Sequence, residues 1–528
     1  MKKALIIVLV AFATILSGCG EKGNENKKEE ISVKEISRTT LNVEEGKSRN
    51  EETDTLEFNL GDRTYDSKSG KVLPYKLRGT ITIPKSQGKK PLAIVIHGSH
   101  NNENENVRFD TGFKYLTEYL GENDYVGAAL DVQPAYVWSY GDNDDNEKIR
   151  AMYKEFINVL KNDAELSQKI DFENIVLIGH SRGADTIIDI ANENENIKGI
   201  LSVAPARLST ERKWPDVNTT IVVPEYDGDV AGLDGIPMFD EMVAEPGRKS
   251  EGNLIILEKA NHNNFNSNLI NNDLELIANK KKLESQLNRE EQERFLKNIS
   301  VDFMDSLFRD EEEGFFKKDS IEPTTMYGLG VKTKSWSSSN EILLNYDNFD
   351  DVKKEDLDLK VLNESSFYKS DETKGFNVPM FFNDELDVKK LLNLRWESDN
   401  ASITIPIDKD LSNKKALIIN LALDPSDELN DPNKKLKVNV TLKDKEGNVV
   451  KVKINDDVKA LSYVEGKLDF TEIFEYKHYF WDSFTPLSMI RVPLELFENI
   501  DMKEVDELSL SFYESDSGAV MIEDITVN

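Results

Sequence analysis

The chain has 528 residues, with 98 acidic against 66 basic side chains and a formal net charge of -32 at pH 7. A surface of this sign repels nucleic acid and anionic lipid headgroups, so nucleic acid is not expected as a partner. The single cysteine excludes an intramolecular disulfide. The length exceeds what one hydrophobic core usually serves, which predicts two domains.

Residues 1–19 have the pattern of an export signal. Lys2 and Lys3 precede the apolar run Ala4–Ile15, and Leu16-Ser17-Gly18-Cys19 closes it. The run is too short to span a bilayer comfortably, which indicates a removable signal. The small residues before Cys19 resemble a bacterial lipobox, which implies cleavage before Cys19 and lipid attachment to its thiol. We therefore expect an extracytoplasmic lipoprotein held at the cell membrane by its lipid anchor alone.

Residues 20–53 are rich in Glu, Lys, Asn and Ser and nearly free of aromatic residues. Such a segment buries too little apolar surface to fold, so we expect a disordered tether. Residues 54–320 then alternate strand and helix patterns, which predicts a mostly parallel sheet flanked by helices. The expected strands are Leu56–Leu60, Leu77–Ile83, Leu92–Ile96, Val126–Leu130, Ile175–Ile178, Ile197–Val203, Thr220–Val223 and Leu254–Leu257. Ligands bind beyond the carboxyl ends of such strands, so the chemistry is expected in the loops that follow them.

One of these strands runs directly into a G-x-S-x-G motif. Gly179-His180-Ser181-Arg182-Gly183 follows Ile175–Ile178, and a helical pattern begins at Ala184. Strand, motif and helix in this order are typical of a nucleophile elbow. Gly179 and Gly183 allow helix and strand to approach, and Ser181 is expected in a strained conformation with an exposed hydroxyl. The alternative is a glycine-rich turn without a catalytic role.

A serine nucleophile needs a base, and the chain offers few histidines. They are His97, His100, His180, His262 and His478. His180 adjoins the serine in the turn and cannot fold back onto it, while His97 and His100 belong to the loop after an early strand. His262 follows a later strand of the same sheet, so we predict it as the general base.

The acid that orients the base is expected after Thr220–Val223. Glu225, Asp227 and Asp229 all lie in that loop, and we favour Asp227 because it lies nearer the strand end than Asp229. A buried carboxylate fixes the tautomer of the histidine and stabilises its imidazolium form. Ser181, Asp227 and His262 would then form a catalytic triad in that chain order.

Two further groups complete the predicted site. The backbone N–H of Arg182, together with that of Gly98 or Ser99, would form the oxyanion hole. Aromatic residues could wall a substrate pocket or simply pack against neighbouring loops. These aromatic residues are Tyr136, Trp138, Tyr140 and Trp214. The short connection 205–218 leaves no room for a large cap, and no metal site is expected.

Residues from about 55 to 310 resemble the α/β-hydrolase fold, within it the chlorophyllase-like or polyester-hydrolase-like branch of bacterial secreted esterases. The resemblance rests on His97-Gly98, the elbow serine Ser181, Asp227, and His262 within Ala-Asn-His-Asn. It implies hydrolysis of a small-molecule or polymer-borne ester through an acyl-serine, with no cofactor or metal. The loop 97–100 departs from polyester hydrolases, so polymer hydrolysis is not carried over.

From about residue 321 to 528, short alternating strands replace helical periodicity, which predicts a β-sandwich. The expected strands are Ala401–Ile405, Lys415–Ala422, Leu436–Lys443, Val449–Ile454 and Leu508–Phe512. The segments Leu391–Trp396, Ile490–Leu494 and 517–525 resemble galactose-binding-like jelly rolls. Such modules often bind carbohydrate, although many are purely structural, and the sequence assigns no ligand residue.

The sequence therefore predicts a surface-tethered serine hydrolase of carboxylic esters with an appended β-sandwich. The same triad could act as a peptidase or amidase, and nothing local separates these cases. A non-enzymatic, surface-anchored glycan-binding protein is the hypothesis from a different class.

Overall fold

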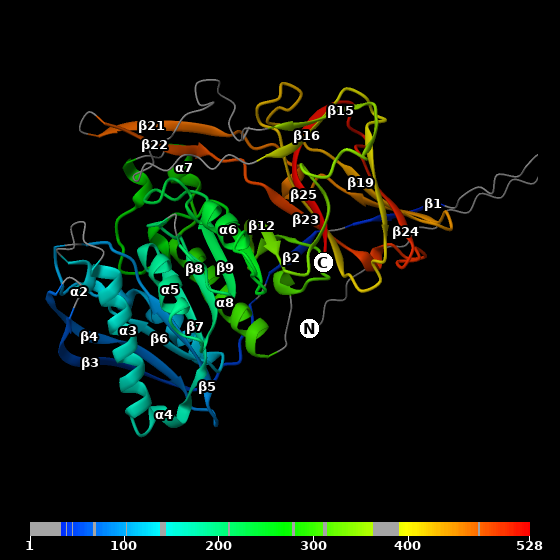
Figure 1. Ribbon diagram of the computed structural model, residues 1–528. Coiled ribbons are helices and arrows are strands. Elements are labelled where there is room, and N and C mark those ends of the chain that lie inside the picture. Colours follow the sequence, from blue (N-terminus) through cyan, green and yellow to red (C-terminus); the bar gives the residue numbers. More distant parts are fainter. Residues whose placement is uncertain are drawn as a thin grey trace, which may run out of the picture.

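The computed structural model describes residues 33–38, 40–44, 46–66, 70–101, 103–137, 144–209, 212–276, 280–309, 314–362, 390–473 and 476–528. The expected signal segment, Cys19, Trp138 and Tyr140 lie outside these ranges. The chain forms a helix-bearing part and a strand-rich part that lie beside each other (Figure 1). Among the described residues, no helix is long and apolar enough to cross a bilayer.

The first part is built on one large sheet. Its strands are β2 (Leu41–Val43), β3 (Thr53–Asp66), β4 (Val72–Pro84), β5 (Lys90–Ile96), β6 (Val126–Leu130), β7 (Ile170–His180), β8 (Ile197–Val203), β9 (Asn218–Pro224), β10 (Gly252–Leu257), β11 (Pro323–Met326) and β12 (Leu329–Trp336). Their order is β2-β11-β12-β10-β9-β8-β7-β5-β6-β4-β3. From β6 to β10 all neighbours are parallel, and β4 and β12 join the two sides of this block antiparallel.

Helices cover both faces of this sheet. The longer ones are α1 (Lys114–Glu122), α3 (Asp144–Asn162), α5 (Arg182–Asn192), α6 (Gly235–Val243) and α8 (Arg289–Phe308), and the shorter ones are α2 (Gln133–Tyr136), α4 (Leu166–Lys169), α7 (Lys280–Ser285), η1 (Asp110–Phe113), η2 (Asn263–Phe265), η3 (Asp273–Leu276) and η4 (Gly314–Phe316). Alternate residues of β5 divide between the faces: Ala93 and Val95 join the cluster with α1 and α8, whereas Leu92 and Ile94 join that with α3 and α5. A strand buried on both faces is apolar throughout, which is why the run was recognisable in the sequence.

The mixed α/β architecture confirms the predicted sheet and most of its elements. Each strand expected between residues 54 and 260 is present, and the two earliest form the antiparallel pair β3 and β4. The expected boundary at residue 320 is wrong. β11 and β12 continue the first sheet, where β12 pairs with β10 from Gly252 opposite Trp336 to Leu257 opposite Val331. β12 thereby covers an edge of β10 that would otherwise expose unpaired backbone groups.

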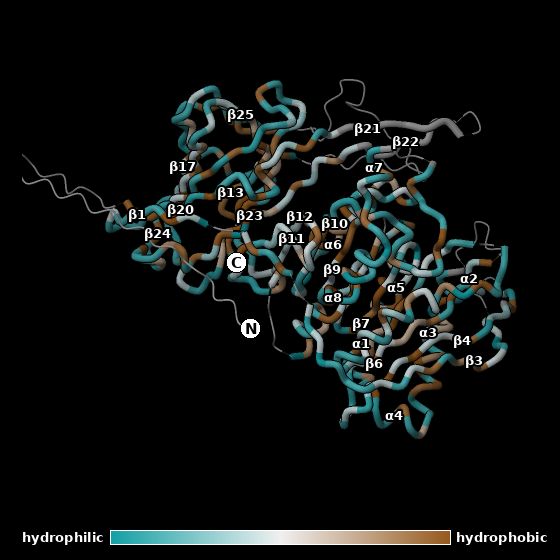
Figure 2. The backbone as a smooth tube through the Cα atoms, turned by 180° about the vertical axis from the view of Figure 1, so that it is seen from behind, coloured by the Kyte–Doolittle hydropathy of each residue, from teal (hydrophilic) through white to brown (hydrophobic). Residues whose placement is uncertain are grey.

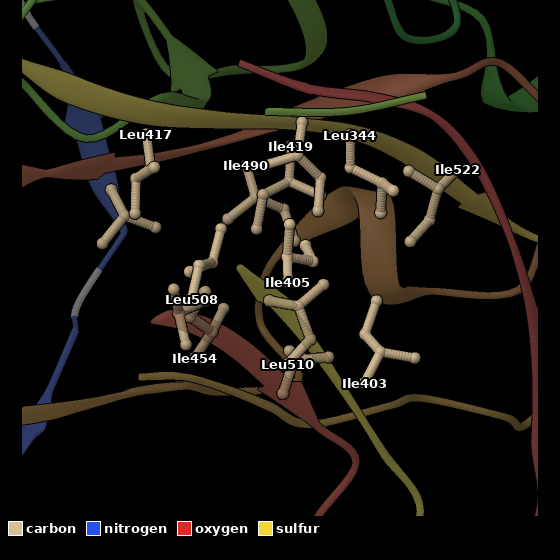
Figure 3. Packing of buried hydrophobic residues seen from close by; sticks show 14 of the residues in the cluster. Leu344, Ile403, Ile405, Leu417, Ile419, Ile454, Ile490, Leu508, Leu510 and Ile522 are labelled. Carbon is tan, nitrogen blue, oxygen red and sulfur yellow. The ribbon is translucent and has the colours of Figure 1, made fainter. Parts of the chain in front are cut away.

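The second part contains two sheets that share one core. One consists of β1 (Val33–Ser37), β20 (Val449–Ile454), β19 (Val438–Asp444), β24 (Val505–Ser511), β17 (Ser402–Lys409) and β14 (Lys353–Glu355), and the other of β15 (Leu357–Leu362), β16 (Leu391–Trp396), β25 (Gly518–Val527), β18 (Ala416–Leu423), β23 (Ser488–Pro493) and β13 (Glu341–Asn345). Ile403 and Leu508 from the first meet Ile419 and Ile490 from the second in one buried cluster (Figure 3). β17 shows the alternation expected of a strand with one buried face, because Ile403, Ile405 and Ile407 point into this space. β21 (Lys467–Ile473) and β22 (Tyr476–Ser483) form a separate hairpin.

The segment expected as a tether is part of the fold from residue 33 onward, so this prediction is wrong there. β1 pairs in parallel with β20, and Ile36 packs against the core of the second part. β2 pairs with β11 in the first sheet. Between them Arg38 forms a buried ion pair with Glu322. The prediction of disorder rested on amino-acid composition alone. Composition contains no information about hydrogen bonds to strands that lie far away in the sequence.

The two parts pack directly against each other. Ile418 and Met489 of the second part are buried in the cluster that also contains α8. The buried Arg491 donates from Nε to the carbonyl of Ser320 at 2.6 Å and from a terminal nitrogen to that of Phe315 at 3.1 Å. Apolar residues fill the interior of both parts, while hydrophilic residues predominate along the outer loops (Figure 2). The contact therefore combines apolar packing with hydrogen bonds shielded from water.

Candidate active site

Ser181 occupies the turn between β7 and α5 in an unusual backbone conformation. Its φ of 57° and ψ of -129° lie outside the regions that an L-residue normally adopts, and it is buried. A Cβ on Gly179 would lie 2.5 Å from Ala184 Cα, and one on Gly183 would lie 2.6 Å from the His97 carbonyl oxygen. Only glycine fits at both positions, as predicted. Ser181 therefore sits at a tight corner where β7 ends and α5 begins.

The loop after β5 lies directly against this serine. A Cβ on Gly98 would lie 2.9 Å from Ser181 Oγ, so Gly98 leaves the space that the hydroxyl occupies. His97 holds the loop in shape, because its Nε2 accepts the N–H of Val132 at 2.9 Å and its Nδ1–H donates to the Gly98 carbonyl at 2.8 Å. The structure thus brings Gly98 of the predicted oxyanion loop against the nucleophile, and Ser99 follows it directly in the chain. Arg182 begins α5 on the other side of the serine.

The predicted acid and base meet at the ends of β9 and β10. His262 Nδ1–H donates to Asp227 Oδ2 at 2.9 Å, and both side chains are buried. The other oxygen, Asp227 Oδ1, accepts the N–H groups of Asp229 at 3.0 Å and Val230 at 2.6 Å. Of the two candidate aspartates, Asp227 is therefore the one hydrogen-bonded to Nδ1 of the ring, the contact expected of the acid.

Asp229 lies on the opposite side of the same imidazole. Its Oδ2 is 3.4 Å from His262 Nε2, and its side chain is 57% exposed. Burial lowers the pKa of His262, but the charges of Asp227 and Asp229 outweigh it and raise that pKa to about 10. In this arrangement the ring is an imidazolium at neutral pH. Because the Asp229 side chain is largely exposed, solvent screens its charge, and the buried Asp227 contributes more to this raised pKa.

His180 connects the turn that carries Ser181 to the loop that carries His262. Its Nε2–H donates to the backbone carbonyl of His262 at 3.0 Å, and the two ring centroids are 4.8 Å apart. Burial, together with the neighbouring His262, holds the pKa of His180 well below its ordinary value. His180 directly precedes Ser181, so the hydrogen bond from its neutral ring fixes the position of His262 relative to the turn that carries Ser181.

Sequence reasoning missed Asp273 in η3. Its side chain connects the loop that carries Asp227 to the loop that carries His262. Its carboxylate accepts the N–H of Gly228 at 2.8 Å, that of His262 at 3.1 Å and that of Asn263 at 3.1 Å. Burial and the nearby Asp227 raise the pKa of Asp273. No signal in the sequence marks it, because it opens a charged stretch that predicted a helix.

The aromatic residues proposed as substrate walls are buried elsewhere. Tyr136 lies beneath the loop after β5, where its hydroxyl donates to the His97 carbonyl at 3.3 Å and the Arg182 guanidinium stacks over its ring at 5.2 Å. Trp214 packs in the apolar cluster between α6 and the sheet. Neither exposes a ring face to a substrate. Trp138 lies outside the described residues.

Glu225, the third acid candidate, faces away from the imidazole. Its carboxylate pairs with the buried Lys332 of β12 at 3.1 Å and accepts the N–H of Lys259 at 3.0 Å. Lys332 also lies 3.7 Å from Glu258, which pairs with Lys459 of the second part at 2.9 Å. The charged side chains at the ends of β9 and β10 thereby connect the site to the second part.

Taken together, the described residues place a strained serine, a histidine–aspartate pair and an N–H-bearing loop at one edge of the sheet. No group of three or more His, Cys, Asp or Glu side chains in this described portion has an arrangement suited to a metal ion. Comparison with known family models gives no match for this chain, and no curated protein sequence matches it.

Proposed function

We propose that the chain is a serine hydrolase that cleaves carboxylic esters through an acyl-serine intermediate. The observation that carries this proposal is the positive φ of Ser181 at a strand-to-helix corner, at the same sheet edge as the hydrogen bond between His262 and Asp227. A serine held in this way, next to a base with its own carboxylate, is the arrangement that nucleophilic acyl transfer requires. The parallel sheet flanked by helices supports assigning residues 54 to about 336 to an α/β-hydrolase type of domain.

In the proposed reaction, Ser181 Oγ attacks the ester carbonyl carbon and its proton passes to His262 Nε2. The carbonyl π electrons move to oxygen, and the oxyanion accepts hydrogen bonds from the Arg182 N–H and from the Gly98–Ser99 segment. Collapse of this intermediate breaks the bond to the alkoxide, which takes the proton from His262. Water, deprotonated by His262, then attacks the acyl carbon, the bond to Ser181 Oγ breaks as Oγ takes the proton back from His262, and the carboxylic acid is released. Asp227 stabilises the imidazolium throughout without taking its proton.

The proposal also covers where the protein is located in the cell and what its second part binds. Lipid attachment at Cys19 would hold the protein at the outer side of a cell membrane, a role that the basic start, apolar run and small residues before Cys19 support. Two sheets packed over one core support a galactose-binding-like jelly roll for the second part. Carbohydrate is its proposed ligand, which would keep the hydrolase near glycan-borne esters.

A fluorophosphonate probe tests the catalytic proposal on the soluble protein without residues 1–19. We expect covalent labelling of the wild type and none of Ser181→Ala, because the probe phosphonylates only an activated serine. Ser202→Ala, which changes a buried serine of β8, is the matched control and should label like the wild type. Silence in both wild type and Ser181→Ala would contradict the proposal and favour a binding protein.

A substrate panel then separates the reaction classes. Short and long acyl esters, acetylated sugars and amides should be offered at equal concentration, with release of acid followed in each case. We expect ester cleavage to exceed amide cleavage, because an amide leaving group requires stronger protonation by His262. Faster amide cleavage would assign the same triad to a peptidase or amidase.

A further inference from the structure

One imidazole beside the nucleophile has no role in the reaction described above. His100 follows β5 in the loop that carries Gly98, and its Nε2 is buried without a hydrogen-bond partner among the described residues. That nitrogen lies 3.0 Å from the point where a Cβ on Gly98 would be, and Ser181 Oγ lies 2.9 Å from the same point. The Nε2 atom and the nucleophilic oxygen therefore border one small space.

The surrounding rings hold His100 in this position. Phe109 packs edge-on against it at 5.2 Å between centroids, and the rings of His180 and His262 lie 5.3 Å and 6.2 Å away. Burial, together with the neighbouring His180, His262 and His97, keeps the pKa of His100 well below its ordinary value. The ring is therefore neutral over the working range of an esterase, and one of its nitrogens carries a proton.

We propose that His100 is a further catalytic residue, whose Nε2–H donates a hydrogen bond to the carbonyl oxygen of the substrate as that oxygen becomes negative. The inference rests on the proposed hydrolase function of Ser181. When Oγ attacks the carbonyl carbon, the electron pair of the C=O bond moves to oxygen, and His100 stabilises the charge there without transferring its proton. The proton of Ser181 goes to His262.

A donor role fits His100 better than a second base. A base that must hold a proton through the reaction is stabilised by a carboxylate, and that partner belongs to His262, whose Nδ1–H meets Asp227 at 2.9 Å. A buried nitrogen without a partner is unfavourable in the free enzyme. A developing oxyanion would satisfy it only in the transition state, which is where such an interaction accelerates a reaction. A neutral imidazole is a competent electrophile of this kind.

Two variants of the soluble protein test the donor role. His100→Gln keeps an N–H donor of similar reach but cannot act as a base, whereas His100→Leu removes the donor. We expect kcat on a short acyl ester to fall 100- to 1000-fold in His100→Leu, about the effect of deleting one oxyanion donor, and at most about tenfold in His100→Gln, with KM nearly unchanged in both. An unchanged kcat in His100→Leu, or equal losses in the two variants, would overturn the donor role.

A spectroscopic readout separates donation from packing. Phosphonylation of Ser181 places a strongly polarised P=O oxygen where the oxyanion forms, so the adduct of the ¹⁵N-histidine-labelled protein should show a protected, downfield imidazole N–H signal. This signal should be absent from the adduct of His100→Gln. An adduct whose imidazole N–H spectrum matches that of His100→Gln would refute the assignment, whatever the effect on rate.

The failure of this inference can be told from that of the proposed function. If the wild type neither reacts with the probe nor cleaves any ester, the hydrolase proposal itself is wrong. If the wild type reacts and His100→Leu reacts at the same rate, only the role of His100 is wrong. Thermal melting of both variants, compared with the wild type, identifies any loss of rate that comes from unfolding.

Discussion

The charge of Asp229 is one of those that raise the pKa of His262, and replacing Asp229 by asparagine tests its contribution directly. Asp229→Asn keeps the shape of the side chain but removes a negative charge 3.4 Å from Nε2. This charge is one of the causes that raise the pKa of His262 to about 10 against the lowering effect of burial. Only neutral His262 can take the proton of Ser181. The acid limb of the kcat/KM profile should therefore move to lower pH in the variant.

The size of the shift follows from the distance and the exposure. Two unit charges 3.4 Å apart interact by about 1.2 kcal/mol at the dielectric constant of water. The water value is appropriate because the Asp229 side chain is 57% exposed and solvent screens its charge. Since about 1.4 kcal/mol corresponds to one pKa unit, we expect the acid limb to move down by about 0.9 pH unit.

The assay follows initial hydrolysis of a neutral short acyl ester, from mildly acidic to strongly alkaline pH, with substrate below KM. Under this condition the profile reports the ionisation of the free enzyme. Asp62→Asn removes the same charge from an exposed position in β3, at the far edge of the sheet, and should leave the limb in place. An unmoved limb in Asp229→Asn, a shift to higher pH, or an equal shift in the control would refute the reasoning.

Three other changes test the architecture of the site and of the contact between the two parts. Gly98→Ala should lower kcat at least about 100-fold in a folded protein, measured by ester hydrolysis and circular dichroism, because its methyl group would lie 2.9 Å from Ser181 Oγ. Gly183→Ala should lower the free energy of unfolding by about 2–3 kcal/mol in urea titration, because its Cβ would meet backbone atoms that cannot move aside. Arg491→Met should cost about 3 kcal/mol in the same titration, because the buried carbonyl of Ser320 loses its charged donor.

Matched controls sharpen these expectations. Gly88→Ala places a methyl group in open space at a φ of 86°, so it should cost only the backbone strain of about 1 kcal/mol. Lys459→Met breaks a partly exposed ion pair between the two parts and should cost less than about 1 kcal/mol. Equal stability of Gly183→Ala and Gly88→Ala, or of Arg491→Met and Lys459→Met, would contradict the packing argument, as would wild-type kcat in Gly98→Ala.

The loops of the candidate site were predictable because two local signals coincide in them. A continuous apolar run such as Leu254–Leu257 marks a strand buried on both faces, and polar residues directly after it mark the edge where ligands bind. This logic alone placed His262 at the same edge of the sheet as Ser181, where its carbonyl meets the ring of His180. Spacing could not decide between Asp227 and Asp229, since the two lie in one loop. The two aspartates differ in the direction in which their carboxylates point, and only Asp227 points at Nδ1 of His262. That direction depends on the turn that the Asp227 side chain itself stabilises.

What the sequence could not show depends on segments that meet only after folding. Asp273 acquires its position from the backbone amides of two separate loops. His100 gains its importance from the distance to Ser181, which no pattern in its own loop contains. For Trp214 the sequence left a pocket wall and packing against neighbouring loops equally open, and the cluster beside α6 buries it.

The pairing of β1 with β20 also limits the order in which the chain can fold during its synthesis. Val33 aligns with Val449, so β1 has no partner strand until the segment around residue 449 has emerged from the ribosome. Contacts of such wide separation close late and slowly. Until then the backbone groups of β1 are unpaired and other molecules could occupy them. Synthesis that stops before residue 449 would leave the first strand unsatisfied, so truncated products should be prone to aggregation and early proteolysis.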